Sequence, residues 1–381
     1  MRAIEKYHRK VRKDWEKLWP TILDSENKIE DFSNGKFAEM IQEHVQCKHV
    51  ELVRNLQSAL TVALKAMEVD AKDLILLPAL GPLDLLEGVI ETQASIVLID
   101  LHPKTYTIDV LDLQKKLKTL GDLERFPKKI VMAMDSFALP ADYPALNQIA
   151  ERYHLNLVEI ASHGLGGEIR QEKVGSFGDL SILNFSQKST VKALFEGACI
   201  CTNHPFLEKQ VKRWNGTGYN RDTQSIDTPA LNRKIHPLES HFLRVALESY
   251  LAFENEKLQE YASFYENNLY DEMEIPFVPG GFRSGWQSYV VLCPNQTIRG
   301  RFIHEMHLAG YSVNIPEWYN YENIFRNMNL ENLILLSNAP VSANLINRWV
   351  NIPLHPYIDF KEIQEIVSNI RRFWKDNTKD E

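Results

Sequence analysis

The sequence has few cysteines, no long apolar run and no excess of positive charge. Its four cysteines lack the spacing of a disulfide framework or a metal clip, so we expect buried thiols and no metal site. No apolar stretch reaches membrane-spanning length and no signal peptide is visible, which predicts a cytoplasmic protein that enters no membrane. The net charge of -8 argues against general affinity for nucleic acid.

One short segment departs from this acidic balance. Five basic residues lie between Lys6 and Lys13, and Trp15 and Trp19 follow at helical spacing. This pattern predicts an amphipathic N-terminal helix whose charged face lies in solvent, rather than a helix that contacts a membrane or nucleic acid.

Common catalytic motifs are also missing. The sequence has no Gly-x-Ser-x-Gly elbow, Walker loop or dinucleotide fingerprint, and the glycines at 164, 166 and 167 predict only a flexible turn. His304 and His307 lie three residues apart on a predicted helix and could share a metal. Since no third ligand is visible, a solvated helix face is the better interpretation.

What the sequence does have is a regular alternation of helices and short apolar strands. Helical patterns occupy 56–67, 85–90, 110–120 and 143–154, and runs typical of buried parallel strands occupy 73–78, 95–100, 129–134 and 156–160. This rhythm predicts a doubly wound, mostly parallel sheet. Two more strands are predicted at 179–184 and 198–202, the second with Cys199 and Cys201 on one face.

The last part of the chain predicts a different organisation. A polar hinge at 215–229 precedes a long helix at 236–268, followed by strands at 288–293 and 311–315 and helices at 298–308 and 360–374. With 381 residues, the chain can bury one large core and a second, smaller one. We therefore predict a large α/β domain over residues 1–230 and a small α+β domain over residues 231–381.

Several segments, spread nearly from end to end, resemble the DegT/DnrJ/StrS nucleotide-sugar aminotransferases. They are Gly175 to Ala198, Pro140-Ala-Asp142, Ile99-Asp100 with Thr105, Thr107 and Asp109, Val158-Glu159, Asn232-Arg233-Lys234, and Trp349 to Pro356. The resemblance implies the fold type I architecture of enzymes that use pyridoxal phosphate (PLP). It also implies a dimer in which each site borrows residues from the other subunit, here through Asn232 and Arg233.

The resemblance also assigns the positions that would hold PLP, and these carry other residue types. Ser189 stands at the position of the lysine that forms a Schiff base with PLP, and a serine cannot form that imine. Ile160 stands where an acid would pair with the pyridine nitrogen. Four other positions also differ from the family. Leu56 and Gln57 stand at the start of the helix that would bind the phosphate group. Pro82 stands where the family has an aromatic residue that stacks on PLP, and Asn184 stands where it has a serine beside the cofactor.

Together these changes predict a pocket that has been filled in and holds no cofactor. Buried polar groups left without their ligand would cost about 1–3 kcal/mol each, so their replacement stabilises a protein that no longer binds PLP. Lys188 or Lys192 could supply an amine instead, although Lys188 and Ser189 should point to opposite sides because neighbouring side chains alternate. Glu159 and His163 could form an acid–base pair at the carboxyl end of the sheet.

The sequence thus predicts a non-catalytic family member in glycan or secondary-metabolite sugar biosynthesis. It would form a homodimer, or a heterodimer with a related aminotransferase, and could bind a nucleotide-linked sugar. One alternative is an active PLP-dependent transaminase of a keto-sugar nucleotide. Another is a PLP-independent enzyme that reuses the old pocket through Glu159 and His163.

Overall fold

The computed structural model describes residues 29–162, 164–220, 223–226 and 230–377, and six single positions before residue 29. Lys6, Lys10, Trp15 and Trp19 of the predicted N-terminal helix lie outside the described residues. Among the described helices, none combines the length and the apolar character needed to cross a membrane.

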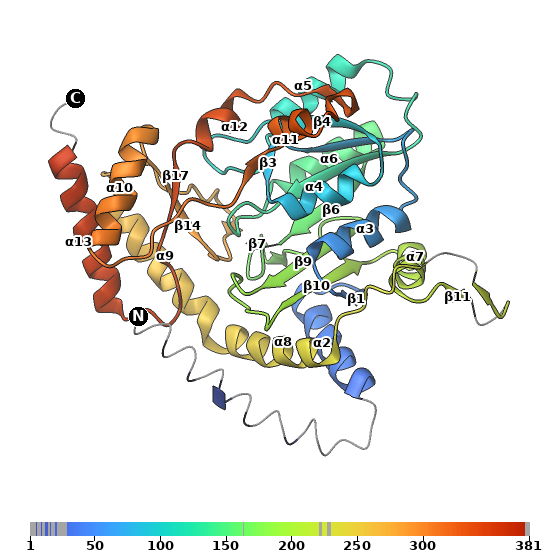
Figure 1. Cartoon of the computed structure of the whole chain (residues 1–381), viewed down its shortest axis with the longest axis horizontal. Coiled ribbons are helices and arrows are strands. Elements are labelled where there is room, and N and C mark those ends of the chain that lie inside the picture. Colours follow the sequence, from blue (N-terminus) through green and yellow to red (C-terminus); the bar gives the residue numbers. More distant parts are fainter. Residues whose placement is uncertain are drawn as a thin grey trace.

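An eight-stranded sheet forms the centre of the molecule, and Figure 1 shows helices on both of its faces. In spatial order its strands are β1 (His49–Val53), β10 (Glu196–Thr202), β9 (Leu180–Ser186), β6 (Asn156–Ala161), β5 (Lys129–Met134), β2 (Leu74–Pro78), β4 (Ser95–Ile99) and β16 (Ile334–Leu336). Neighbours from β9 to β16 are parallel, whereas β10 is antiparallel to both β9 and β1. The predicted mostly parallel sheet is therefore confirmed.

Two hydrophobic cores lie on opposite faces of this sheet. The first packs α3 (Leu56–Ala66) and α4 (Leu83–Ile90) on one face, and the second packs α5 (Val110–Leu120) and α6 (Tyr143–Tyr153) on the other. The predicted helices begin where polar side chains cap them: Asn55, Asp109 and Asp142 each accept a hydrogen bond from a backbone N–H of the first turn. Helix α7 (Pro205–Asn215) follows β10.

The predicted long helix is present but contains a π-turn. It consists of α8 (Pro237–Ser249), the π-helical segment η1 (Tyr250–Glu254) and α9 (Asn255–Leu269). Within η1 the carboxylate of Glu254 is buried, where it accepts hydrogen bonds from Ser249 Oγ (2.5 Å) and Tyr357 Oη (2.6 Å). In Figure 1 this bent helix runs from α2 (Ile29–Val45) to α13 (Phe360–Asn377).

The C-terminal part packs helices against a two-stranded antiparallel sheet. Strand β14 (Tyr289–Leu292) pairs with β17 (Trp349–Ile352), and α10 (Gln296–Leu308) packs on α13 through stacked Phe302 and Trp374. The strand predicted at 311–315 is wrong: only an isolated bridge joins Asn314 to Asn351. Pro316 follows directly and has no N–H to extend a ladder.

Shorter elements complete the fold. They are β3 (Leu80–Gly81) with β15 (Tyr319–Asn320), β7 (Glu168–Ile169) with β8 (Glu172–Lys173) and β13 (Phe282–Arg283), the hairpin β11 (Tyr219–Asn220) and β12 (Ser225–Ile226), α11 (Tyr321–Asn327), the 3-10 turn η2 (Glu331–Leu333), and α12 (Pro340–Leu345). The domain boundary at 230/231 stays a prediction. Strand β16 lies beyond that boundary and still joins the large sheet.

Candidate functional site

A buried carboxylate lies on β6, near the carboxyl edge of the sheet. Glu159 is fully buried and accepts hydrogen bonds from Gly175 N (2.6 Å), Phe177 N (2.9 Å) and Ser181 Oγ (2.6 Å). Burial raises the pKa of Glu159, and these three donors partly oppose that rise. Through these hydrogen bonds Glu159 fixes the loop before β9 and the start of that strand, which is a structural role. Its predicted partner His163 lies outside the described residues.

A second buried carboxylate, which the sequence interpretation missed, directly follows β5. Asp135 Oδ1 accepts hydrogen bonds from Tyr143 Oη (2.7 Å) and Ala141 N (3.1 Å), while Oδ2 has no partner among the described residues. Burial raises the pKa of Asp135, and the charge of Glu159 raises it further. The sequence does contain a signal for this residue: Asp135 directly follows an apolar strand, and ligand-binding residues gather at the carboxyl ends of such strands.

The loop after β6 passes very close to this second carboxylate. A Cβ atom at Gly164 would lie 2.4 Å from Asp135 Oδ2, so only glycine fits there. Asp135 and Glu159 thus form a pair of buried acids whose surroundings are built from loops of the same sheet edge. Because two buried like charges repel, the pair favours a state in which a proton is retained.

The opposite side of β6 is apolar. Ile160 is completely buried, and it shares one hydrophobic core with Leu56 at the start of α3. The resemblance assigns position 160 to the acid that pairs with the pyridine nitrogen of PLP, and position 56 to the helix start that binds its phosphate group. Neither side chain can pair with a pyridinium or bind a phosphate group.

Four aromatic side chains cover the carboxyl ends of β4 and β5. This aromatic block consists of Tyr106, Phe137, Trp318 and Trp349; Phe137 stacks on Trp318 with ring centroids 4.6 Å apart, and both rings meet Trp349 edge to face. Phe137 has a positive φ of 53°, a conformation that costs energy for a bulky residue. The C-terminal part of the chain therefore closes this edge of the sheet.

The end of β2 is closed in a similar way. Pro82, at the expected stacking position, accepts a hydrogen bond from Tyr321 Oη through its carbonyl oxygen (2.8 Å). A Cβ atom at Gly81 would lie 2.2 Å from the same hydroxyl. Tyr321 is completely buried. A ring stacked on Pro82 from this side would have to displace Tyr321.

Ser189 closes a tight turn. Its buried hydroxyl accepts a hydrogen bond from Ser186 N (2.9 Å) and lies 3.1 Å from Ser186 Oγ. Its neighbour Lys188 is 74% exposed and pairs with Glu317 at 2.5 Å. Ser189 thus points into the turn while the amine of Lys188 lies at the surface.

Two further positions flank this turn. Asn184 borders a cavity of about 10 Å³ between the end of β6 and the turn, which is the space of one water molecule. Lys192 is partly buried, and this burial lowers its pKa, although the nearby charge of Glu254 opposes that shift. Of the two candidate amines for a Schiff base, Lys192 is therefore more buried than Lys188.

The start of α3 is occupied by side chains of the protein itself. Asn55 Oδ1 accepts a hydrogen bond from Ser58 N, and its amide donates to Glu196 Oε2 (2.9 Å). Arg233 Nη1 lies 3.3 Å from Ser58 Oγ, so it reaches the same helix end from within one chain. Gln57 is half-buried in the first turn, and Asn232 is exposed with a φ of 45°.

The histidines and cysteines considered as metal ligands or reactive thiols have structural roles or lie exposed. His307 Nε2 bonds to the carbonyl oxygen of Val313 (2.6 Å), and His304 is exposed. Within the part of the chain that the structure describes, no three His, Cys, Asp or Glu side chains are grouped as metal ligands. Cys199 and Cys201 are both buried in one core, as the alternation predicted. A hydrogen bond with Cys199, together with burial, raises the pKa of Cys201.

Comparisons with known proteins agree with this architecture. Residues 12–371 match the model of the DegT/DnrJ/EryC1/StrS aminotransferase family. The UDP-N-acetyl-3-dehydro-alpha-D-glucosamine 3-aminotransferase of Acidithiobacillus ferrooxidans is 22% identical over 82% of this chain and 81% of its own length. The dTDP-3-amino-3,6-dideoxy-alpha-D-galactopyranose transaminase of Aneurinibacillus thermoaerophilus is 22% identical over 91% and 90%.

A solved structure shows the same fold. The DegT DnrJ EryC1 StrS aminotransferase from Brucella abortus has a TM-score of 0.85 at 21% identity and covers 97% of this chain and 96% of its own. At this identity the likeness concerns the fold alone. With the family model spanning almost its whole length, the chain belongs to the DegT/DnrJ/EryC1/StrS aminotransferase family.

Proposed function

We propose that this protein does not carry out PLP chemistry and serves as a non-catalytic partner subunit of a related sugar aminotransferase. The observation that supports the first half is the hydroxyl of Ser189, which is bound within a closed turn. The resemblance assigns this position to the lysine that forms the Schiff base. The burial of Ile160 and Leu56 in one core supports the same conclusion. The described residues at these positions do not fit PLP.

The partner role is supported by an exposed aromatic residue beside the old cofactor edge. Phe195 is 70% exposed, and it directly precedes Glu196, which binds Asn55 at the start of α3. The hairpin of β11 and β12 adds two more exposed apolar side chains, Tyr219 and Ile226. Aromatic residues are enriched where proteins contact one another. We expect a subunit of a related aminotransferase to cover them.

The loss of PLP chemistry is tested by absorbance. Purified full-length protein is mixed with PLP, treated with borohydride, freed of unbound cofactor and analysed by mass spectrometry for a labelled lysine. We expect neither a retained chromophore nor a labelled peptide. A single labelled lysine that disappears in Lys192→Ala or Lys188→Ala would instead establish an ordinary transaminase with a relocated amine.

The partner role is tested by coexpression with a lysine-bearing family member from the same source. We expect the two chains to copurify at a fixed ratio, and Phe195→Asp to abolish copurification. Leu111→Asp is the matched control, since Leu111 is 72% exposed on α5 and should not affect assembly. A strict homodimer in the presence of the relative would overturn the proposal.

Besides PLP, the family relationship suggests a nucleotide-linked sugar as a ligand. Calorimetry with a nucleotide sugar tests it independently of the partner experiment, because binding to the isolated chain needs no second subunit. Heat that saturates at one ligand per chain would establish a binder. Its absence would leave the partner role unaffected.

A further inference from the structure

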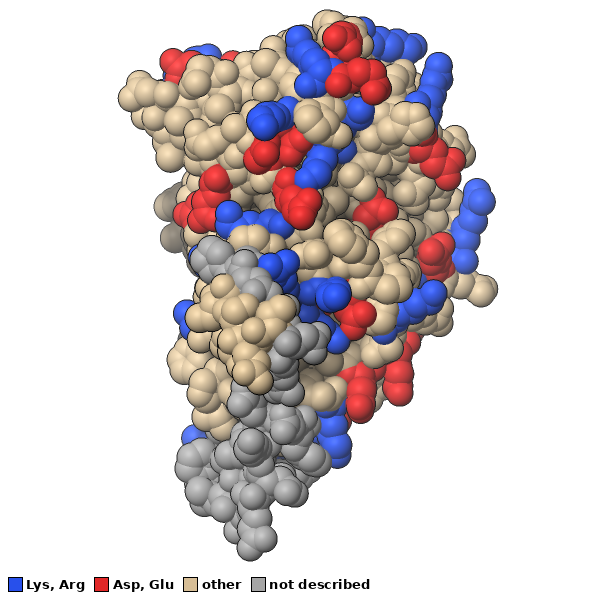
Figure 2. Space-filling view, turned by 90° about the vertical axis from the view of Figure 1, so that its right-hand side faces the viewer, with Lys and Arg blue, Asp and Glu red and all other residues tan. Residues whose placement is uncertain are grey.

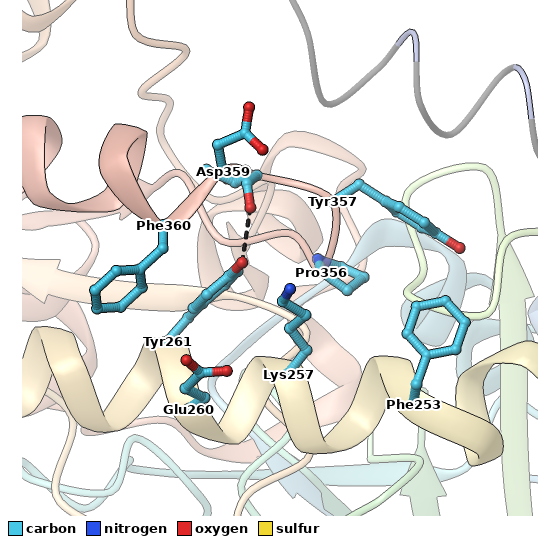
Figure 3. Close-up of a pocket in the computed structure, with 9 residues that line it drawn as sticks. Phe253, Lys257, Glu260, Tyr261, Pro356, Tyr357, Asp359 and Phe360 are labelled. Atoms are coloured by element: carbon cyan, nitrogen blue, oxygen red, sulfur yellow. Dashed lines mark hydrogen bonds between the residues drawn. The ribbon is translucent and has the colours of Figure 1, made fainter.

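A pocket of about 220 Å³ opens on the surface between α9 and residues 356–360 (Figure 3). Its lining includes none of the positions discussed above as a PLP site. One wall is a single face of the bent helix, and the other is the segment that leads into α13. This pocket is open to solvent, unlike the closed edge under the aromatic block.

The pocket walls are aromatic rings held in place by their own hydroxyl groups. Tyr261 Oη donates a hydrogen bond to the carbonyl oxygen of Ile358 (2.7 Å), drawn as the dashed line in Figure 3. Tyr357 Oη donates to Glu254 Oε1 (2.6 Å). Since both hydroxyl protons are used internally, the rings present mainly apolar surface to the pocket. Phe360 and Phe253 extend this surface at the two ends.

The π-turn of η1 orients this wall. It places the carboxylate of Glu254 inside the protein and leaves the adjacent Phe253 44% exposed at the pocket. One residue of register corresponds to about 100° of rotation in a helix. Without the extra residue of the π-turn, Lys257 and Tyr261 would therefore face a different direction. Such π-turns occur frequently at functional sites.

Charged groups of both signs lie between the aromatic rings. The ammonium group of Lys257 lies 5.7 Å from the ring centre of Tyr261, and Glu260 lines the pocket beside it. Among the described residues, neither Lys257 nor Glu260 forms an ion pair with another side chain. The pocket thus offers a strong donor and a strong acceptor within one small space. A hydroxyl group can bond to both, because it donates and accepts.

We propose that this pocket binds a single sugar ring. The C–H face of the ring would lie against the aromatic walls, and its hydroxyl groups would bond to Lys257 and Glu260. A phosphate group is disfavoured because the carboxylate of Glu260 lines the pocket together with its single lysine. An organic cation is disfavoured because the ammonium group of Lys257 would repel it. An apolar ligand is disfavoured because it would bury the charges of Lys257 and Glu260 without a hydrogen-bond partner.

The pocket volume limits the ligand to one ring. Sites for drug-sized ligands usually enclose about 300–1,000 Å³, and this pocket is smaller. A monosaccharide or the terminal residue of a glycan fits this size, whereas a nucleotide-linked sugar does not. This inference is independent of the partner role proposed above.

Saturation-transfer NMR with the full-length protein tests this site. The probes are methyl β-glucoside and methyl N-acetyl-β-glucosaminide, with glycerol as an acyclic polyol. We expect transfer to the ring protons of at least one glycoside and none to glycerol. Lys257→Met and Glu260→Gln should each weaken binding about tenfold, as expected for the loss of one hydrogen bond to a charged group.

Lys212→Met is the matched control, because Lys212 is an exposed lysine on α7 with its own i,i+4 partner Glu208. It should leave glycoside binding unchanged. Thermal melting shows whether each variant is folded. No transfer to either glycoside, equal transfer to glycerol, or transfer that survives both Lys257→Met and Glu260→Gln in folded protein would overturn the proposal.

Discussion

The two faces of β6 differ in what their side chains do. Glu159 points to one face and receives three hydrogen bonds from the chain that leads into β9. Ile160 points to the other face and lies in an apolar core. These neighbours belong to one segment that matches the family. Glu159 holds the backbone of the next segment, whereas the position that the resemblance assigns to the acid of a PLP site carries an apolar side chain.

The same distinction holds elsewhere at the sheet edge. Asp142 caps α6, and Asn55 caps α3. The ends of β2, β4 and β5 are covered by Tyr321 and the aromatic block. Among the described residues, acidic and basic side chains are interspersed on the face drawn in Figure 2.

The largest effect is expected from Glu159→Ala. Three buried donors would lose their acceptor, and each costs about 1–3 kcal/mol when left unpaired. The free energy of unfolding should therefore fall by several kcal/mol in urea denaturation. Ile160→Val, the control on the other face, should cost only about 0.5–1.5 kcal/mol. Equal losses from the two substitutions would remove the distinction between the faces.

A smaller, pH-dependent effect is expected from Asp135→Asn. The pKa values of Asp135 and Glu159 are both raised in the folded protein, so the folded state holds protons that the unfolded state releases. The stability that these protons provide is present at low pH and is lost as the pH rises through the raised pKa values. Asp135→Asn removes one of the two acids and should flatten this decline.

Urea denaturation between about pH 5 and pH 8 measures this effect. The variant should gain stability relative to the natural protein as the pH rises. Asp122→Asn, which changes an exposed carboxyl, is the control and should leave the slope unchanged. A constant difference between Asp135→Asn and the natural protein over this range would show that the pair does not retain a proton.

A small effect is expected from Ser189→Ala, which removes the hydrogen bonds between the Ser189 hydroxyl and Ser186 in the turn. Its cost should be about 1 kcal/mol. Lys188→Ala breaks only an exposed ion pair and should cost less still. Ser189→Lys should not restore a borohydride-reducible PLP adduct, since Ile160 and Leu56 remain unchanged. A PLP adduct in Ser189→Lys would show that the rest of the site had survived.

Much of the fold could be predicted from the sequence because local patterns determine it. The helices that cover the large sheet begin at capping residues such as Asp109, and buried parallel strands such as Leu74–Pro78 are short, mainly apolar runs. Strand β16 escaped prediction because it has only three residues and forms through its pairing with β4. The π-turn also escaped, since it depends on the distant partner Tyr357.

The resemblance assigns a cofactor position to residues 56, 160 and 189, and that assignment stays a prediction. The packing around the sheet edge could not be predicted from the sequence. That Trp318 stacks on Phe137, and that Tyr321 reaches Pro82, depends on contacts between segments far apart in the sequence. No local pattern places such side chains. The donors to Glu159 were likewise hidden, because two of them are backbone N–H groups.

The pairing of β16 with β4 has a consequence for synthesis of the chain. Ile334 lies beside Ile96, so the edge of β4 stays uncovered until β16, far later in the chain, has left the ribosome. An unpaired strand edge is a template for aggregation. The nascent protein should therefore depend on chaperones for longer than its early, locally encoded helices alone would require.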